Sequence, residues 1–197
     1  MNFLAHIFLS FGDKEITIGN FIADSIRANK FQHLPTKVQK GIKLHRHIDT
    51  YTDAHSIPKI SSRRLHANYS HYSRVIVDIY YDHFLAKNWY KYSDTPLDIF
   101  VEDFYDLLED NYEILPEGVK RMMPYMISDN WLYNYSKMEG IGNVLNGMNR
   151  RTKNKSKMNF AIIDLEEHYD SFEKEFTEFF EELITFSKHK YISLLNK

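Results

Sequence analysis

The sequence contains no cysteine among its 197 residues, and this absence removes several kinds of chemistry. Disulfides, thiolate nucleophiles, Cys-ligated zinc and iron–sulfur clusters are all excluded. Any metal ion would have to be held by histidine, aspartate or glutamate. Glycine (7) and proline (5) are also scarce. Few tight turns are therefore expected, which favours helices over a fold rich in hairpins.

Long apolar runs and a strong excess of one charge are missing as well. No run approaches the roughly 20 apolar residues of a transmembrane helix, and MNFLAHIFLSFGDKE lacks a basic leader and a small-residue cleavage site. We therefore expect a cytoplasmic location without membrane insertion. The net charge of −2 gives no overall attraction for nucleic acid, so no nucleic-acid partner is expected.

What the sequence does contain is typical of one globular domain. Phe and Tyr number 14 each, which predicts an aromatic core. A chain of this length suits one domain rather than two, so residues 1–197 are predicted to form a single all-α helical bundle. Apolar residues at helical spacing predict helices over approximately 1–11, 18–26, 36–51, 59–68, 71–89, 97–112, 116–135, 141–151 and 160–195.

Two of these helices carry further predictions. Pro124 is expected to kink or divide the segment 116–135. The last helix has aromatic residues at helical spacing, and they are predicted to face the core: Tyr169, Phe172, Phe176, Phe179 and Phe180.

The stretch 43–55, KLHRHIDTYTDAH, has more ionisable side chains than an amphipathic helix needs. His45 and Asp49 are four residues apart, so on a helix they project from one face, about 40° apart around the axis. An imidazole and a carboxylate placed together form half of a site for a divalent metal. His47 and His55 lie off this face or beyond the helix, and we interpret them as surface or outer positions.

Two other apolar segments carry polar pairs with the same spacing, Asn20 with Asp24 and Asp78 with Asp82. One such pair could be only a buried hydrogen bond. A carboxylate in an apolar helix is costly to bury unless it is paired or bound to a metal. We therefore expect these helices to converge on a shared polar centre, with the candidate ligands His6, Asp24, His45, Asp49, Asp78 and Asp82.

These candidate ligands offer only nitrogen and oxygen, and their excess of carboxylates favours manganese or magnesium, with iron or a catalytic zinc also compatible. Such a centre polarises a phosphoryl oxygen and lowers the pKa of a bound water, so hydrolysis of a phosphate ester is the leading chemical class. No glycine-rich phosphate loop, Gly-x-Ser-x-Gly elbow or His-Glu-x-x-His motif competes with this interpretation.

Six segments together are specific enough to indicate a family: MNFLAH (1–6), GNFIAD (19–24), GIKLHRHIDTYTD (41–53), DIYYDHFLAKNW (78–89), NVLNGMNRR (143–151) and LEEHYDSFE (165–173). On these segments the chain resembles the acyl carrier protein phosphodiesterases, also called acyl carrier protein hydrolases, which are similar to divergent HD-domain phosphohydrolases. The chain departs from the HD signature because it has no adjacent His-Asp dyad. The ligand set and the metal count therefore stay open.

The resemblance implies an HD-domain-like helical fold and a reaction. The reaction is hydrolysis of the phosphodiester between 4′-phosphopantetheine and a serine of holo acyl carrier protein, with Mn²⁺ as cofactor and Mg²⁺ or Fe²⁺ as alternatives. Such a reaction would belong to fatty acid and lipid metabolism. The resemblance implies metal binding by the six candidate ligands above, with Arg46 and His83 nearby. It implies catalytic roles for Asp24, His45, Asp49 and Asp82.

Acyl carrier proteins are acidic, so a docking surface for them should be basic. We predict that substrate is bound by Arg46, Arg63, Arg64, Arg150 and Arg151, with help from Arg27 and Lys30. Two other interpretations stay open. The chain could hydrolyse a nucleotide or another small phosphodiester, or it could be a non-catalytic helical protein that binds a metal. The sequence does not indicate an oligomeric state.

Overall fold

The computed structural model describes residues 1–27 and 30–196, and the regular elements in these ranges are all helices. The all-α prediction is therefore confirmed. No helix within these ranges is both long and apolar enough to cross a membrane. The α-helices are α1 (Phe3–Phe8), α2 (Lys14–Ile22), α3 (Thr36–Ala54), α4 (Ser56–Tyr69), α5 (Ser73–Lys87), α6 (Leu97–Asp110), α7 (Glu117–Ser128), α8 (Trp131–Asn134), α9 (Met138–Arg151), α10 (Ala161–Glu167) and α11 (Tyr169–Leu195).

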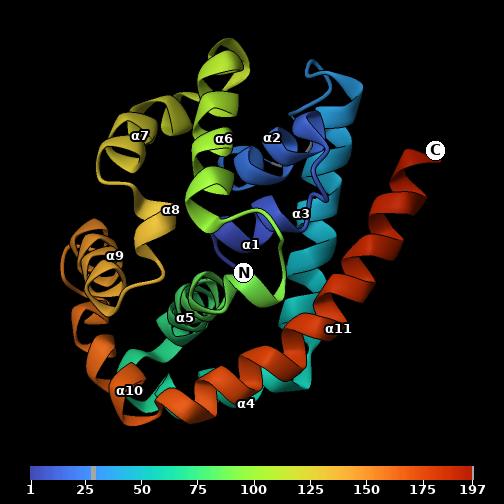
Figure 1. The fold of residues 1–197 in the computed structure, drawn as a ribbon. Helices are drawn as coiled ribbons and strands as arrows, with labels where there is room; N and C mark the ends of the chain where they lie inside the picture. Colours follow the sequence, from blue (N-terminus) through green and yellow to red (C-terminus); the bar gives the residue numbers. More distant parts are fainter. Residues whose placement is uncertain (28–29, 197) are drawn as a thin grey trace.

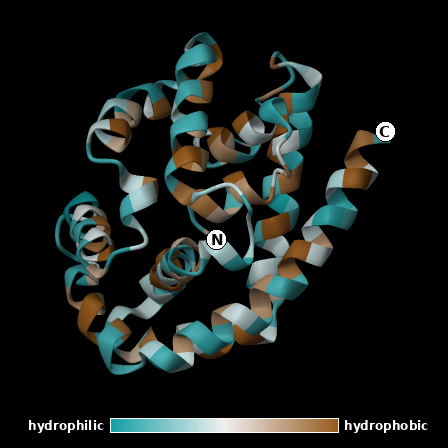
Figure 2. Cartoon of the chain, in the orientation of Figure 1, coloured by the Kyte–Doolittle hydropathy of each residue, from teal (hydrophilic) through white to brown (hydrophobic). Residues whose placement is uncertain are grey.

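The helices are arranged around α5, which Figure 1 shows almost end-on near the middle of the fold. Helix α1 packs against α2 and α5, while α11 packs against α3, α4 and α5. Figure 2 shows hydrophobic and hydrophilic residues alternating along α11, as expected for a long helix with one buried side. Helix α5 thus contacts both the first and the last helix of the chain.

The predicted aromatic core lies between α5 and α11. Phe172, Phe176, Phe179 and Phe180 on α11 are fully buried. The ring of Phe172 packs edge-on against Tyr80 of α5, with ring centroids 5.0 Å apart. The prediction that the aromatic stripe of the last helix faces the core is confirmed for these four residues.

Helices α2 and α3 touch through their backbones at two glycines. A Cβ atom at Gly19 would lie 2.0 Å from the carbonyl oxygen of Val38, and one at Gly41 would lie 2.2 Å from that of Ile16. Real Cβ atoms do not approach backbone oxygens so closely, so any larger residue would push the two helices apart. This contact sets the distance between Asn20, which directly follows Gly19 on α2, and His45, which lies one turn beyond Gly41 on α3.

Three predicted helices differ clearly from the structure, and the first is the one predicted over 18–26, because α2 spans Lys14–Ile22 and a 3₁₀ turn follows it. Pro124 does not divide its helix, because α7 continues through it to Ser128, and the chain turns only at Asn130, whose φ is 45°. The segment 160–195 is not one helix but two, since the backbone leaves the helical region at His168, with φ −116° and ψ 24°. Helix α10 packs against α9 and α11 against α3 and α4, so the break lets each part face its own neighbours.

Candidate metal centre

Three elements from the first part of the chain bring the first group of predicted site residues together. Helix α1 supplies His6, the short 3₁₀ turn η1 (Ala23–Ser25) that follows α2 supplies Asp24, and α3 supplies His45 and Asp49. His6 and His45 are buried, whereas the side chains of Asp49 and Asp24 are 41% and 76% exposed. The site therefore has a buried imidazole floor and carboxylates at its opening.

The Asp49 carboxylate contacts both imidazoles. Its Oδ1 lies 3.2 Å from Nε2 of His6, and its Oδ2 lies 3.0 Å from Nε2 of His45. The two rings stack, with centroids 3.9 Å apart and planes 18° apart. One potential ligand atom from each of these three residues lies within 4.8 Å of the others. Asp24 Oδ1 adds a further contact, 3.1 Å from Nε2 of His45.

The two histidines differ in charge when no metal is bound. Burial, and then the positive charge of His45, lowers the pKa of His6 to about 4. Burial alone would also lower the pKa of His45, but hydrogen bonds to Asp24 and Asp49 raise it to about 9. Burial acts to raise the pKa of Asp49, yet its hydrogen bond to protonated His45 holds that pKa well below the ordinary range. At neutral pH, His45 is therefore protonated and His6 is neutral.

Neutral His6 has one ring nitrogen without a proton, and no described residue donates a hydrogen bond to the lone pair of that nitrogen. Asn20 donates through Nδ2 to the backbone oxygen of His6 (2.7 Å) and to Ser10 Oγ (3.0 Å), so its Oδ1 must accept from Nδ1 of His6 (2.8 Å). The proton of His6 is thus on Nδ1. Its Nε2 is buried without a hydrogen-bond partner and faces an Asp49 oxygen. Two facing acceptors repel unless a cation lies between them.

These donors fit a divalent metal ion. His6 and His45 can supply neutral imidazole nitrogens, and Asp49 can supply an oxygen to the same ion, a donor set that manganese, iron, magnesium and zinc all accept to different degrees. Asp24 can approach from the solvent side through its contact with His45. The choice of manganese stays a prediction.

The structure places Asp78 and Asp82 in a second group rather than among these donors. Asp82 is fully buried, and its carboxylate accepts from the backbone N–H groups of Leu4 (2.7 Å) and Ala5 (3.2 Å). It therefore caps the first turn of α1 from a neighbouring helix. Asp78 pairs with the amino group of Met1 at 3.0 Å. Both carboxylates hold the start of the helix that carries His6, and metal binding by them stays a prediction.

Asp82 is nevertheless an unusual carboxylate. Burial raises its pKa to about 7, although the two backbone hydrogen bonds act in the opposite direction. His83, the next residue, is also buried, and both of its ring nitrogens have partners: the backbone oxygen of Tyr135 and the hydroxyl of Tyr169, each at 2.7 Å. His83 therefore links α5 to the residue that follows α8 and to α11.

Comparison with known proteins decides the family. The family model described as acyl carrier protein phosphodiesterase matches residues 1–183. The chain belongs to the acyl carrier protein phosphodiesterase family. The resemblance inferred from the six sequence segments is therefore confirmed.

Similarity to curated members of the acyl carrier protein phosphodiesterase family extends over nearly the whole length. The protein of that name from Pectobacterium atrosepticum is 30% identical over 191 residues, covering 95% of this chain and 98% of the relative. Those from Photorhabdus laumondii and Escherichia coli strain E24377A are 32% and 34% identical, covering 96% of this chain and 96% and 99% of their own lengths. No solved structure matches the chain, so the HD-domain-like architecture stays a prediction.

The predicted substrate-binding arginines fall into two classes in this family member. Arg64 is held by Glu175 of α11 at 2.9 Å and lies over the ring of Phe172, 4.7 Å from its centroid. It therefore joins α4 to α11. Arg46 lies over the ring of Phe31, 5.0 Å from its centroid. Among the residues predicted to bind substrate, the exposed arginines are Arg27, Arg63, Arg150 and Arg151, and Lys30 is exposed as well.

The chain segment after α9 extends this cationic surface. Asn149 is buried and fixes the loop, since its Oδ1 accepts from Ser156 Oγ (3.1 Å) and its Nδ2 donates to Asn154 Oδ1 (3.0 Å). The exposed cations of this segment make no ion pair with any described residue, and we call them the 150–157 surface: Arg150, Arg151, Lys153, Lys155 and Lys157.

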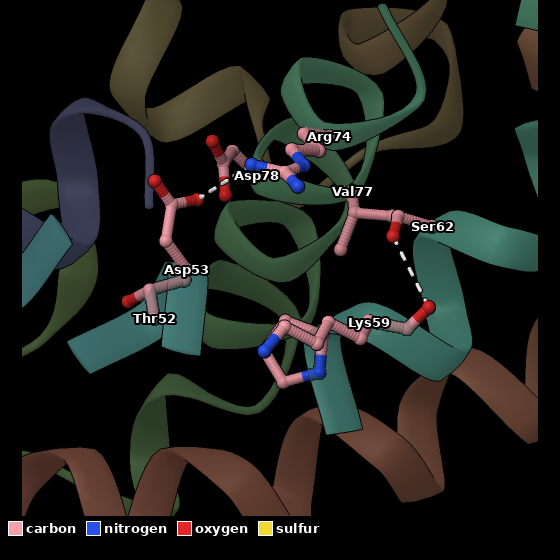
Figure 3. A pocket seen from close by; sticks show the side chains of 8 residues that line it. Thr52, Asp53, Lys59, Ser62, Arg74, Val77 and Asp78 are labelled. Atoms are coloured by element: carbon pink, nitrogen blue, oxygen red, sulfur yellow. Dashed lines mark hydrogen bonds and ion pairs between the residues drawn. The ribbon is translucent and has the colours of Figure 1, made fainter. Parts of the chain in front are cut away.

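A small pocket lies one helical turn beyond Asp49, between α3, α4 and α5. Figure 3 shows Asp53 and Arg74 pointing toward each other across it, with Asp78 beside them. The closest charged atoms of Asp53 and Arg74 are 3.6 Å apart. The pocket has room for about one water molecule, with a volume of about 20 Å³. It is therefore too small for a substrate group, and the open side of the centre lies at Asp24 and Asp49.

Sequence reasoning missed one central residue of the site. Asn20 is fully buried and contacts both imidazoles, through its side chain to His6 and through its backbone oxygen to His45. Its spacing from Asp24 marked it as polar in an apolar helix, but an amide is a poor metal ligand, so the pattern did not reveal its role. The role of Asn20 is visible only in the structure, where it lies beside two histidines that are distant from it in sequence.

Proposed function

We propose that this protein is a metal-dependent phosphodiesterase that hydrolyses the 4′-phosphopantetheine–serine phosphodiester of holo acyl carrier protein. The products would be apo acyl carrier protein and 4′-phosphopantetheine. The observation that carries the proposal is the buried lone pair of His6 facing Asp49 beside His45, in a chain that belongs to the acyl carrier protein phosphodiesterase family. We propose Mn²⁺ as the cofactor.

In this proposal, His6, His45 and Asp49 hold the metal. When bound, the ion supplies Lewis acidity toward a phosphoryl oxygen and toward water. Asp24 is the most exposed carboxylate of the centre, so its free oxygen can take a proton from the water that attacks phosphorus. The phosphorus–oxygen bond to the carrier serine then breaks, and the serine oxygen receives that proton.

Mass spectrometry of the carrier protein tests the reaction directly. Holo acyl carrier protein would be incubated with the pure enzyme and Mn²⁺, and loss of the phosphopantetheine mass would be followed over time. Chelation of the metal should stop the loss. Turnover of a nucleotide or a simple phosphodiester, with no change in the carrier, would instead favour a small-molecule phosphohydrolase. A metal-binding protein inactive on all of these would be non-catalytic.

Metal affinity is expected to rise with pH. In the metal-free protein His45 holds its proton below about pH 9, because its folded pKa is raised by Asp24 and Asp49. A metal must displace this proton, so between about pH 6 and 8 the affinity should increase about tenfold per pH unit, with about one proton released per ion. Calorimetric titration with Mn²⁺ in two buffers of different ionisation enthalpy measures the proton count. Binding without proton release would contradict the assignment of His45.

Charge reversal at the 150–157 surface is expected to weaken docking of the acidic carrier. The double variant Arg150→Glu/Arg151→Glu should raise KM for holo acyl carrier protein about tenfold and leave kcat nearly unchanged, because exposed charges act on encounter more than on chemistry. The effect should shrink in high salt. Lys14→Glu makes a charge change at another exposed position and serves as the control. Equal KM values for the control and the double variant would rule out this surface.

A further inference from the structure

One residue orients both imidazoles of the candidate metal centre. Asn20 lies near the end of α2, is fully buried, and contacts His6 and His45 through different atoms. We propose that Asn20 is a positioning residue that fixes the tautomer of both histidines, so that each presents Nε2 to the metal. This inference rests on the proposed metal site.

The contact with His6 depends on the fact that an amide side chain has both a hydrogen-bond donor and an acceptor. Asn20 Nδ2 donates to the His6 backbone oxygen (2.7 Å) and to Ser10 Oγ (3.0 Å). These two bonds fix which end of the amide is the oxygen. The oxygen then accepts from Nδ1 of His6 at 2.8 Å, which leaves Nε2 of His6 without a proton.

The contact with His45 uses the backbone of the same residue. Nδ1 of His45 donates to the Asn20 carbonyl oxygen at 2.8 Å. A carbonyl oxygen can only accept, so Nδ1 of His45 always carries a proton. Nε2 is then the atom that exchanges its proton for a metal, and it points toward Asp24 and Asp49 at 3.1 Å and 3.0 Å.

Other side chains of similar size cannot replace the amide fully. Aspartate would keep the acceptor for Nδ1 of His6 but would lose the donors to His6 and Ser10. Leucine would lose both. Without an acceptor at Nδ1, neutral His6 would gain by moving its proton to Nε2, where Asp49 Oδ1 is 3.2 Å away. That tautomer would block the metal. Outer partners of metal-ligating histidines commonly change metal affinity about 10- to 100-fold.

The test compares Asn20→Leu with Asn20→Asp and reads the tautomer directly. Long-range ¹H–¹⁵N spectra of the metal-free protein at neutral pH should place the His6 proton on Nδ1 in the wild type and in Asn20→Asp, and on Nε2 in Asn20→Leu. Mn²⁺ affinity, measured by calorimetry, should fall about 10- to 100-fold in Asn20→Leu and be partly restored in Asn20→Asp. Thr17→Val removes a buried hydroxyl of α2 whose hydrogen bond, within the described part of the chain, is to the backbone oxygen of Asp13, and it should change neither result.

Several outcomes would overturn the proposal. One is an Nε2-protonated His6 in the metal-free wild type, which stays measurable even if Asn20→Leu does not fold. Another is an unchanged His6 tautomer and unchanged Mn²⁺ affinity in a folded Asn20→Leu. Neither measurement uses hydrolysis of the carrier. Absence of phosphodiesterase activity would therefore refute the proposed function while leaving the role of Asn20 to be decided separately.

Discussion

The Asp49→Asn variant is expected to lose at least about 100-fold in kcat/KM for holo acyl carrier protein. Asp49 is the only described carboxylate that contacts both His6 and His45. Outer-shell partners of a metal site already cost about 10- to 100-fold when removed, so a residue placed as a direct ligand should cost at least the upper value. Asparagine has nearly the same shape, so the fold should survive. Mn²⁺ affinity should fall together with activity.

The matched control for this variant is Asp53→Asn, one turn further along α3. The side chains of Asp53 and its partner Arg74 are each 65% exposed, and such exposed ion pairs contribute little. This variant should retain wild-type kinetics within about twofold. Full activity of Asp49→Asn, or an equal loss in both variants, would show that Asp49 does not hold the catalytic metal.

The Gly41→Ala variant is expected to be strongly destabilised. The new methyl group would lie 2.2 Å from the Ile16 carbonyl oxygen and 2.8 Å from the Cα of Gly19, so α2 and α3 would have to separate. Overpacking costs about 1–3 kcal/mol, and a clash between rigid backbones belongs at the upper end. For a chain of this size that corresponds to a loss of about 6–12 °C in Tm. Separation of α2 from α3 should also weaken Mn²⁺ binding, because the Asn20–His45 contact crosses this interface.

The Gly147→Ala variant, in contrast, is expected to be more stable than the wild type. Gly147 lies inside α9, and nothing would come within 4 Å of a Cβ atom there. Alanine should therefore stabilise the protein by about 0.4–1 kcal/mol, because it restricts the unfolded chain and favours the helix. Calorimetric or optical melting curves of both variants check the pair. A Gly41→Ala variant as stable as Gly147→Ala would mean that the two helices do not touch in this way.

The sequence predicted the helices well because apolar spacing is a local property. It also predicted the pairing of His45 with Asp49, since a four-residue separation on one helix determines that geometry. The expectation that polar pairs converge, together with the family resemblance, places His6 and Asp24 at the same centre. The structure brings all four together.

What local patterns could not predict is the partner that each buried polar group chooses. Asp82 needed a partner because burial of a lone carboxylate is costly, and the sequence favoured a metal. The structure gives it the backbone N–H groups of Leu4 and Ala5, which no side-chain pattern reveals. In the same way, Gly19 and Gly41 read as ordinary helical glycines until the crossing of α2 and α3 is known.

The capping of α1 by Asp82 also determines when the centre can assemble during protein synthesis. His6, Asp24, His45 and Asp49 all lie within the first 49 residues. The carboxylate that holds α1, however, is 78 residues beyond Leu4. Tyr135, which accepts a hydrogen bond from Asn2, is 133 residues beyond Asn2. A nascent chain on the ribosome would thus display every proposed ligand well before it could hold His6 in place. In the proposed metal site, loading with metal is therefore expected only after the synthesis and docking of α5.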